Sequence, residues 1–214
     1  MLNLIFAKIT FMKNFFLTLL VICLSCDIST SKPVDNINPV YSVDNQKFEN
    51  MSKAYFASGC FWCVETIYES LDGVEEVYSG YAGGTTINPN YYQVMSGKTG
   101  HAEAIEIIYD SSKVSFDTLL KVFFDSHNPT TPNRQGPDYG TQYRSIAFYN
   151  NQDEKNKINN YISFLSTSSI FGKEIITEVK KIDKFYYAEE YHQDYEKKNP
   201  YNPYVQNVSI PRFN

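Results

Sequence analysis

The sequence predicts one α+β domain, a two-layer sandwich in which helices pack against a mixed β-sheet. Expected strands and amphipathic helices interleave, but without the regular spacing of the βαβ units that build a doubly wound sheet. The 214 residues are 43% hydrophobic and 16% aromatic, which suffices for one sizeable core and is too little for two. The sequence contains no internal repeat. One domain of catalytic size is therefore expected.

The first two elements meet at Gly59. Residues 55–58 predict a short buried strand, Gly59 predicts a tight turn, and a helix is expected after it. The apolar face of that helix consists of Val64, Ile67, Tyr68 and Leu71. Cys60 would lie at the helix N-terminus, where unpaired N–H groups and the helix dipole favour thiolate over thiol. Cys60 is therefore the expected activated nucleophile, and Cys63 lies one turn away, close enough to form a disulfide.

The later elements continue the alternation. Strands are expected over residues 74–81, 102–109, 145–149 and 175–182, and helices over residues 115–127, 153–165 and 189–195. Ser115 has the side chain of a helix N-cap, and residues 88–92 predict a loop or a helix start. Residues 128–142 hold three prolines and two glycines, which predicts a long irregular loop with a functional role. The tail from Asn199 is expected to be irregular.

The N-terminal residues predict an export signal. Lys13 precedes an apolar run over residues 15–25, which has about the length of a signal-peptide core and is too short to span a bilayer comfortably. Ser25 before Cys26 resembles the cleavage site of bacterial lipoproteins, in which the cysteine becomes the lipidated first residue. Ordinary cleavage and an uncleaved anchor remain alternatives.

The chain is thus expected to have three segments. These are a lipoprotein-like signal peptide over residues 1–25, a flexible tether over residues 26–52 and a folded domain over residues 53–214. The tether is expected because this stretch is polar, with two prolines and no sustained periodicity. Met12 gives a more compact region before the apolar run than Met1 does, so translation is expected to start at Met12.

Charge excludes some partners. The net charge is −5 and no basic run is present, so neither a nucleic acid nor an anionic membrane surface is an expected partner.

The Cys60-x-x-Cys63 pair allows more than one chemistry. Cys23 and Cys26 lie in the N-terminal apolar segment, so this pair holds the only cysteines in the body of the chain. Such a pair fits thiol–disulfide exchange and also half of a zinc site. Zinc would need two further ligands, and no ligand-pair spacing is found among His101, His127 and His192. A thioredoxin-like dithiol oxidoreductase is a second alternative, although bulky residues between the cysteines are unusual for it.

Several long motifs narrow the choice among these chemistries. They are Gly59-Cys60-Phe61-Trp62-Cys63-Val64-Glu65, Gly80-Tyr81-Ala82-Gly83-Gly84, Gly97-Lys98-Thr99-Gly100-His101-Ala102-Glu103, Tyr109-Asp110 and Asp138-Tyr139-Gly140-Thr141-Gln142-Tyr143-Arg144-Ser145. Together they resemble the peptide methionine sulfoxide reductase A family, and residues 191–195 and 198–200 resemble the C-terminal region of that family. The similarity spans residues 54–200. It implies a ferredoxin-like core and a peptide-methionine (S)-S-oxide reductase without a bound cofactor.

Sulfoxide reduction requires a nucleophile on sulfur and an acid on oxygen, because S–O cleavage without protonation would expel an oxide-like leaving group. Cys60 supplies the nucleophile. Glu103 is the expected acid, since burial on an apolar strand disfavours the carboxylate and raises its pKa. Glu106, on the same strand, is expected to be an ordinary exposed glutamate.

The resemblance assigns substrate binding to five further residues. The two oxygen-binding tyrosines of the family match Tyr91 and Tyr143, whose hydroxyls would hold the sulfoxide oxygen beside the acid. Asp138 matches a loop aspartate that helps to bind substrate and to order the site. Phe61 and Trp62 would form the apolar pocket for the ε-methyl group.

The resolving step is expected to use Cys63. After attack, Cys60 becomes a sulfenic acid with which a second thiol must condense. Many relatives use cysteines in a C-terminal tail, whereas residues 64–214 contain none. Cys63, where some relatives have glycine, should therefore resolve Cys60 and give a disulfide that an external thioredoxin-like dithiol reduces. Two further departures, Asn90 for a common threonine and Met95 for a frequent cysteine, bear on substrate preference.

The expected setting is the bacterial cell envelope. The protein would be a lipoprotein anchored in the membrane through Cys26, or a periplasmic protein, and a monomer. Its substrates would be oxidised methionine in envelope proteins or the free amino acid. A non-catalytic module that only binds oxidised methionine is the alternative, against which the intact pair of Cys60 and Glu103 argues.

Overall fold

The computed structural model describes Tyr41, Val43 and residues 45–212 of the chain. The expected signal peptide, the lipidation site Cys26 and most of the expected tether lie outside the described residues. Among the residues described, no helix is both long and apolar enough to cross a membrane.

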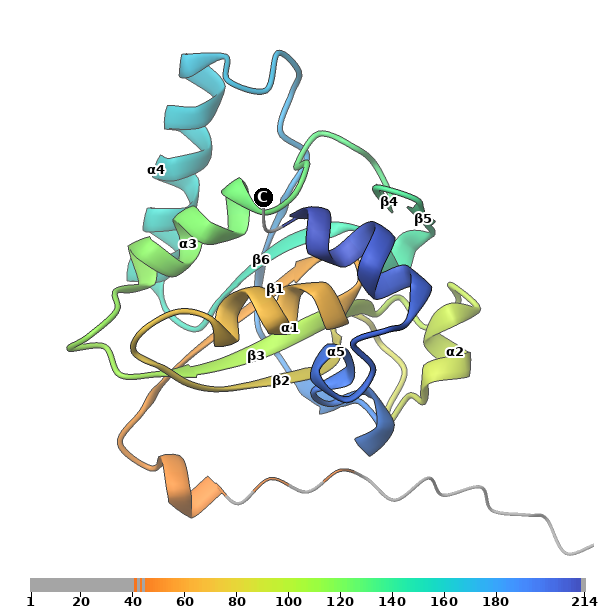
Figure 1. The fold of residues 1–214 in the computed structure, drawn as a ribbon. Coiled ribbons are helices and arrows are strands. Elements are labelled where there is room, and N and C mark those ends of the chain that lie inside the picture. Colours follow the sequence, from red (N-terminus) through yellow and green to blue (C-terminus); the bar gives the residue numbers. More distant parts are fainter. Residues whose placement is uncertain (1–40, 42, 44, 213–214) are drawn as a thin grey trace, which may run out of the picture. The chain divides into compact units, whose positions relative to one another are not determined.

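A six-stranded sheet forms one layer of the fold (Figure 1). Its strands, in spatial order, are β7 (Glu178–Lys181), β6 (Ser145–Tyr149), β1 (Ser52–Ser58), β3 (Ala102–Tyr109), β2 (Val74–Ala82) and β8 (Phe185–Tyr187). The pairs within β6-β1-β3-β2 are antiparallel, whereas β7 runs parallel to β6. In chain order the four central strands have the order 4-1-3-2, which is the ferredoxin-like arrangement. The predicted mixed sheet and ferredoxin-like core are confirmed.

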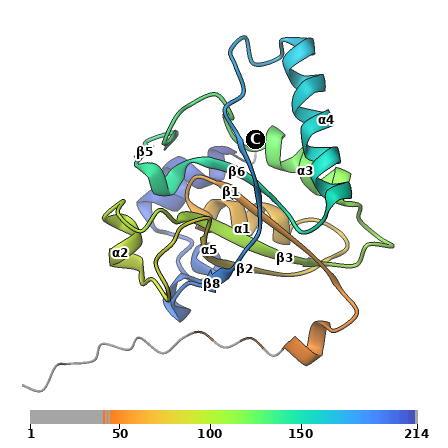
Figure 2. The same ribbon diagram turned by 180° about the vertical axis from the view of Figure 1, so that it is seen from behind.

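The helices form the second layer. They are α1 (Phe61–Glu69), α2 (Tyr91–Met95), α3 (Phe116–Asp125), α4 (Gln152–Ser168) and α5 (Tyr195–Lys198). Figures 1 and 2 show α1 lying along the sheet, with α3 and α4 beside it. The predicted cap at Ser115 is confirmed, because its side chain accepts a hydrogen bond from the Thr118 N–H. Asn90, which was not predicted to be a cap, forms a reciprocal capping box with Gln93. Residues 88–92 therefore lead into a helix.

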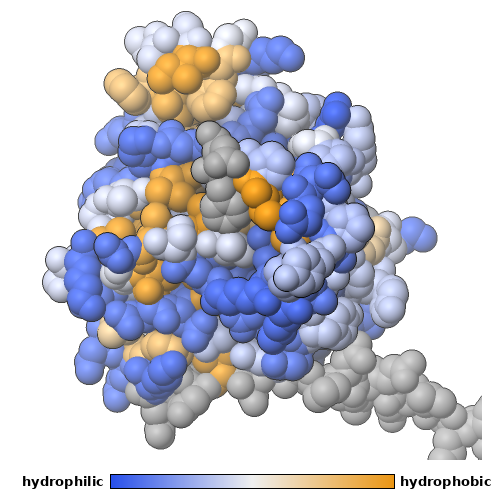
Figure 3. All heavy atoms as spheres, in the orientation of Figure 1, coloured by the Kyte–Doolittle hydropathy of each residue, from blue (hydrophilic) through white to orange (hydrophobic). Residues whose placement is uncertain are grey.

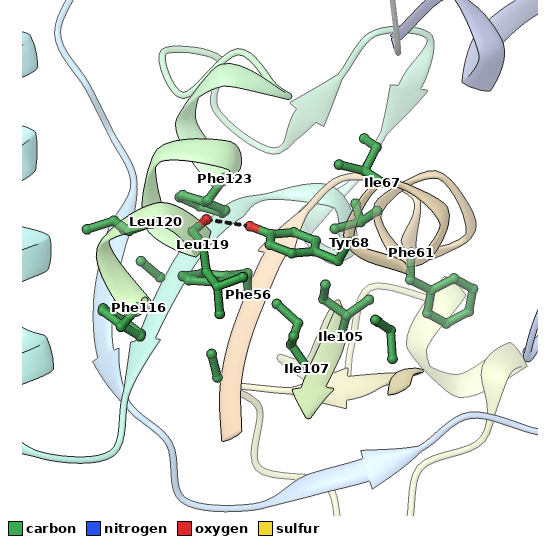
Figure 4. Packing of buried hydrophobic residues seen from close by; sticks show 14 of the residues in the cluster. Phe56, Phe61, Ile67, Tyr68, Ile105, Ile107, Phe116, Leu119, Leu120 and Phe123 are labelled. Carbon is green, nitrogen blue, oxygen red and sulfur yellow. Dashed lines mark hydrogen bonds between the residues drawn. The ribbon is translucent and has the colours of Figure 1, made fainter. Parts of the chain in front are cut away.

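The main core lies between the sheet and α1 with α3 (Figure 4). Phe56 of β1 stacks on Tyr68 of α1 at 5.8 Å between ring centroids and on Phe123 of α3 at 4.9 Å. The Tyr68 hydroxyl donates to the Leu119 carbonyl at 2.9 Å. This packing fixes α1, and with it the cysteine pair at its start.

The opposite face of the sheet is also covered. Phe48, at the end of a 3-10 turn (Asn45–Phe48), is buried with Tyr78 and Ile108, and Tyr41 packs against the same cluster. Packing therefore begins before Lys53, so the expected tether over residues 26–52 is too long at its C-terminal end. The expected tether is mainly polar in composition, so the few aromatic side chains that pack it on the sheet gave no clear signal in the sequence.

Four other expectations differ from the structure. The helix expected over residues 189–195 is a 3-10 turn, Glu190–His192, and α5 begins only at Tyr195. The strand expected over residues 175–182 is only Glu178–Lys181. The loop over residues 128–142 contains a small hairpin, β4 (Arg134–Gln135) with β5 (Asp138–Tyr139), and a 3-10 turn, Thr141–Tyr143. The tail is not wholly irregular, because it forms a π-helical turn, Val205–Ser209, and a 3-10 turn, Ile210–Arg212. These short elements depend on tertiary contacts, which local sequence patterns do not report.

The face shown in Figure 3 is mainly hydrophilic. Its uppermost apolar patch lies over the end of α4 and the turn after it, where Phe164 and Ile170 are exposed.

Candidate active site

The site is built on the turn between β1 and α1. Gly59 has φ +96°, and a Cβ there would lie 2.7 Å from the Gln135 side chain, so the turn requires glycine. Cys60 follows as the N-cap of α1 and is 6% exposed. The predicted place of Cys60 at a helix N-terminus is confirmed.

Glu103 enters the site from the buried strand β3. Its side chain is 2% exposed, and its Oε2 accepts a 3.0 Å hydrogen bond from the Phe61 N–H in the first turn of α1. Burial raises the pKa of Glu103 to about 8. The expected burial of Glu103 is confirmed, and at neutral pH the carboxyl group holds a proton that it can donate.

Glu106 was expected to be exposed, and this prediction was wrong. It is 2% exposed on the face of β3 opposite Glu103. Its carboxylate accepts hydrogen bonds from Tyr55 at 2.7 Å and Tyr187 at 2.8 Å, and it pairs with Lys53 at 3.1 Å. Both faces of this central strand are covered, so neither glutamate reaches solvent.

The resting charge on the cysteine pair also differs from the prediction. Burial, together with a hydrogen bond to Cys63, raises the pKa of Cys60 well above its usual value. The same hydrogen bond lowers the pKa of Cys63 to about 7. Burial thus favours the thiol form of Cys60 over the thiolate. The helix N-terminus favours the thiolate, but burial, which short sequence patterns do not reveal, outweighs it here.

Tyr91 and Tyr143 both lie within electrostatic range of Glu103 and Cys60. Burial raises the pKa of Tyr91 to about 12, and the charges of Glu103 and Cys60 act in the same direction. Burial and the Glu103 charge also raise the pKa of Tyr143. Both hydroxyls therefore stay protonated and can donate hydrogen bonds. The Tyr143 hydroxyl contacts Met95 Sδ at 3.5 Å.

Trp62 is held from two sides. Its ring stacks on Tyr195 of α5 at 3.7 Å between centroids, and its Nε1–H donates to His192 Nδ1 at 3.1 Å. Tyr204 meets the Trp62 ring edge-on at 6.1 Å. Phe61, by contrast, is 1% exposed and belongs to the main core. The pocket roles of Phe61 and Trp62 remain predictions.

Asp138 lies on β5, half-buried. Its Oδ2 accepts a 2.5 Å hydrogen bond from the Tyr204 hydroxyl, and burial raises its pKa. A hollow of about 450 Å³ adjoins this pair. It is lined by Ser126, Gln135, Gly136, Pro137, Asp138, Tyr204, Asn207, Val208 and Arg212. Neither Cys60 nor Glu103 lines it.

The C-terminal residues contribute contacts that the sequence did not indicate. Ser209 lies 2.6 Å from the Cys63 sulfur. Arg212 lowers the pKa of Cys63 and donates hydrogen bonds to the Ser58 and Ser126 carbonyls. No motif marks Tyr204, Ser209 or Arg212, whereas His192 and Tyr195 lie in a stretch whose family resemblance was a usable signal.

Metal ligation has no candidate in the described part of the chain. No group of three or more His, Cys, Asp or Glu side chains is placed to hold a metal ion among those residues. His127 instead hydrogen-bonds to Phe123 and Ser145, and His192 to Trp62.

Known sequences resemble this chain over most of its length. A family model described as peptide methionine sulfoxide reductase matches residues 52–214. A peptide methionine sulfoxide reductase MsrA of Trichodesmium erythraeum is 52% identical over 153 residues, covering 72% of this chain and 86% of that protein. One from Nautilia profundicola is 50% identical over 162 residues, covering 76% and 92%.

Solved structures of similar fold carry related descriptions. Mxr1 from Saccharomyces cerevisiae in its reduced form superposes with a TM-score of 0.68 at 32% identity, covering 77% of this chain and 92% of that chain. Methionine sulfoxide reductase A of Corynebacterium diphtheriae superposes with a TM-score of 0.64 at 34% identity, covering 72% and 78%.

Proposed function

The chain belongs to the peptide methionine sulfoxide reductase family, and on this premise we propose that Cys60 takes the oxygen from methionine sulfoxide while Glu103 protonates it. The protein is an enzyme that reduces methionine sulfoxide to methionine in a thiol-dependent reaction. The geometry of the site supports the proposed division of work among its side chains.

The link between Phe61 and Glu103 carries this proposal. Since the Phe61 N–H donates to Glu103 at 3.0 Å, the acid lies directly beside the residue that follows Cys60. A sulfoxide seated between them would have its sulfur facing Cys60 and its oxygen facing Glu103. Proton transfer from Glu103 to the oxygen makes the sulfur electrophilic, and Cys60 attacks it as the thiolate.

The attack requires Cys60 to lose its proton, although burial disfavours the thiolate. Cys63, hydrogen-bonded to Cys60, is the base closest to that proton. After oxygen transfer, Cys60 is a sulfenic acid and methionine leaves as the thioether. One sulfur is oxidised by two electrons and the other is reduced by two.

Tyr91 and Tyr143 hold the sulfoxide oxygen in this proposal. Both hydroxyls are protonated donors, and both lie within electrostatic range of Glu103 and Cys60. Hydrogen bonds aimed at the oxygen draw electron density from the S–O bond as it breaks, so they favour the transition state over the bound substrate. Asp138 and Trp62 would complete the substrate side of the site, with Trp62 held in place by Tyr195.

Cys63 then resolves Cys60. The two side chains lie one helical turn apart, and each shifts the pKa of the other, so a disulfide needs only a small approach of the sulfurs. An external dithiol of thioredoxin type would reduce this disulfide. The S epimer of the sulfoxide, peptide-bound or free, is the proposed substrate.

The experiment is an assay of dabsyl-methionine sulfoxide with dithiothreitol. Wild-type enzyme is expected to turn over and the Cys60→Ser variant to lose turnover. A Cys63→Ser variant is expected to form one equivalent of methionine in a single turnover and to lose recycling by thioredoxin. Unchanged turnover in Cys60→Ser would refute the assignment of the nucleophile, and full thioredoxin-supported turnover in Cys63→Ser would refute the resolving step.

We also propose that the protein is exported, as a monomer, to the bacterial cell envelope and anchored by lipid on Cys26. The apolar run over residues 15–25 and the small Ser25 before Cys26 support this. Mass spectrometry of the mature N-terminus tests this proposal. A mature chain that begins with a residue other than Cys26 and carries no lipid there would refute lipid anchoring.

A further inference from the structure

The C-terminal segment, residues 204–212, closes over the second cysteine. Cys63 is fully buried, and so is Ser209, whose hydroxyl lies 2.6 Å from the Cys63 sulfur. These two residues are 146 positions apart in the sequence. Most sulfur in a buried site contacts apolar groups, so a hydroxyl aimed at one thiol needs an explanation.

The C-terminal segment is fixed at both of its ends. The Tyr204 hydroxyl donates to Asp138 at 2.5 Å. Arg212 Nη2 donates to the Ser126 carbonyl at 3.0 Å and to the Ser58 carbonyl at 3.3 Å. Ser209 lies between these anchors, so its hydroxyl is held against the cysteine by three hydrogen bonds that involve no part of α1.

We propose that Ser209 and Arg212 are positioning residues for the resolving thiol: the hydroxyl donates to the Cys63 thiolate, and the guanidinium stabilises its charge and anchors the segment. This rests on the proposed function, in which Cys63 resolves Cys60. Ser209 and Arg212 would have this role only in a chain that has a cysteine at position 63.

The charges around Cys63 come from four elements. Cys60 donates a hydrogen bond from the same turn, and Arg212 and Ser209 favour the thiolate from the C-terminal segment. Negative charge on Glu103 of β3 or on the buried Glu196 of α5 disfavours the Cys63 thiolate. Tyr204 remains protonated because burial raises its pKa. Arg212 is the cation named among the largest influences on the pKa of Cys63.

The step that these residues assist is balanced within the site. The Cys63 thiolate attacks the sulfur of the Cys60 sulfenic acid, an S–S bond forms and the S–O bond breaks. The oxygen takes up a proton and leaves as water. Both sulfurs end at the disulfide level, and no further oxidant is needed.

The test is the pH dependence of disulfide formation in the full chain. One equivalent of methionine sulfoxide is mixed with reduced enzyme, and samples are quenched by acid and alkylation at each pH. Mass spectrometry counts the Cys60–Cys63 disulfide, and the methionine formed in the same mixture is measured for normalisation. Ser209→Ala is expected to move the half-maximal pH of disulfide formation upward by about one unit, because one hydrogen bond to the thiolate is lost.

The role of the positive charge on Arg212 is tested by two substitutions. Arg212→Gln is expected to shift the profile upward in the same way, and Arg212→Lys is expected to restore most of the shift because it keeps the cation. Gln206→Ala, in the same segment, is the matched control, since the Gln206 side chain bonds only to the Pro200 carbonyl and is exposed. Thermal melting of each variant checks that the fold is kept.

The outcomes separate the two proposals. If methionine forms but wild-type enzyme yields no Cys60–Cys63 disulfide, the resolving step of the proposed function fails. If wild-type enzyme forms the disulfide and the Ser209→Ala profile coincides with that of Gln206→Ala, the resolving step stands and the positioning role of Ser209 is refuted. A lower rate at every pH without a shift would likewise overturn the positioning role, because a purely structural effect is independent of pH.

Discussion

The Phe61 N–H donates a 3.0 Å hydrogen bond to Oε2 of Glu103, which joins the first turn of α1 to the buried strand β3. This bond fixes the acid relative to the nucleophile without using the Cys60 sulfur. A side-chain substitution at position 61 leaves this backbone N–H in place. The acid is therefore tested by substituting Glu103 itself.

Glu103→Gln should lower the rate of methionine formation by about 10² to 10⁴. Burial raises the pKa of Glu103 to about 8, so its acid form is present at neutral pH and is lost as the pH rises through that value. The wild-type rate should therefore decline above about pH 8, whereas the variant should lack this alkaline decline. Single-turnover rates between pH 6 and pH 9.5 measure both effects.

The matched control for that experiment is Glu106→Gln, on the other face of the same strand. It should keep the alkaline decline of the wild type, since Glu106 contacts Tyr55, Tyr187 and Lys53 rather than the reacting groups. An alkaline decline that persists in Glu103→Gln would assign the titrating acid to another group.

Glu106→Ala should lower the free energy of unfolding by about 3 kcal/mol, because the Tyr55 and Tyr187 hydroxyls lose their acceptor inside the protein. Urea denaturation monitored by circular dichroism measures the change. Glu49→Ala, at an exposed position, should change stability by less than about 0.5 kcal/mol. Equal stabilities of the two variants would contradict a structural role for Glu106.

Tyr68→Phe should destabilise the protein by about 1 kcal/mol, because it removes the 2.9 Å hydrogen bond to the Leu119 carbonyl while keeping the ring in the core. The same denaturation assay applies. Tyr201→Phe is the control, since Tyr201 is 91% exposed. Loss of much more than 2 kcal/mol would mean that the ring itself shifts.

His127 should make the protein less stable as the solution becomes acidic. It is 8% exposed and hydrogen-bonds through both ring nitrogens, to the Phe123 carbonyl and the Ser145 hydroxyl. Burial lowers its pKa to about 3, whereas an unfolded histidine titrates near pH 6.5. The neutral ring therefore contributes full stability above about pH 6.5 and loses it as the pH falls toward 3, by about 1.4 kcal/mol per pH unit.

The contribution of His127 is isolated by comparison with His127→Gln. The difference in unfolding free energy between wild type and variant should shrink between pH 6.5 and pH 4.5, as measured by urea denaturation at each pH. A difference that is constant over this range would show that His127 accepts a proton in the folded protein.

Much of the fold could be predicted because its signals are local. The apolar runs over residues 102–109 and 145–149 and the capped helix after Ser115 are each visible in neighbouring residues. The structure has β3, β6 and α3 at these places. The position of Cys60 after Gly59 could be predicted for the same reason, since a tight turn and a helix start are properties of neighbouring residues.

The environment of each side chain could not be predicted in the same way. Glu103 and Glu106 are three residues apart on one strand, yet only the sheet order shows that helices cover one face and that Tyr55 and Tyr187 cover the other. The resting charge of Cys60 was likewise misjudged, because the degree of burial is a property of the whole fold.

The sequence by itself determined the cysteine pair, the strand that carries the acid and the family to which they belong, since these depend on residue order over short stretches. Only the tertiary structure decided which thiol is the more acidic, what holds Trp62 and what lies against Cys63. Those answers depend on Tyr195, Ser209 and Arg212, which reach the site only after the chain has folded back across more than a hundred residues. Burial and long-range hydrogen bonds set the local pKa, and neither leaves a pattern between neighbouring residues.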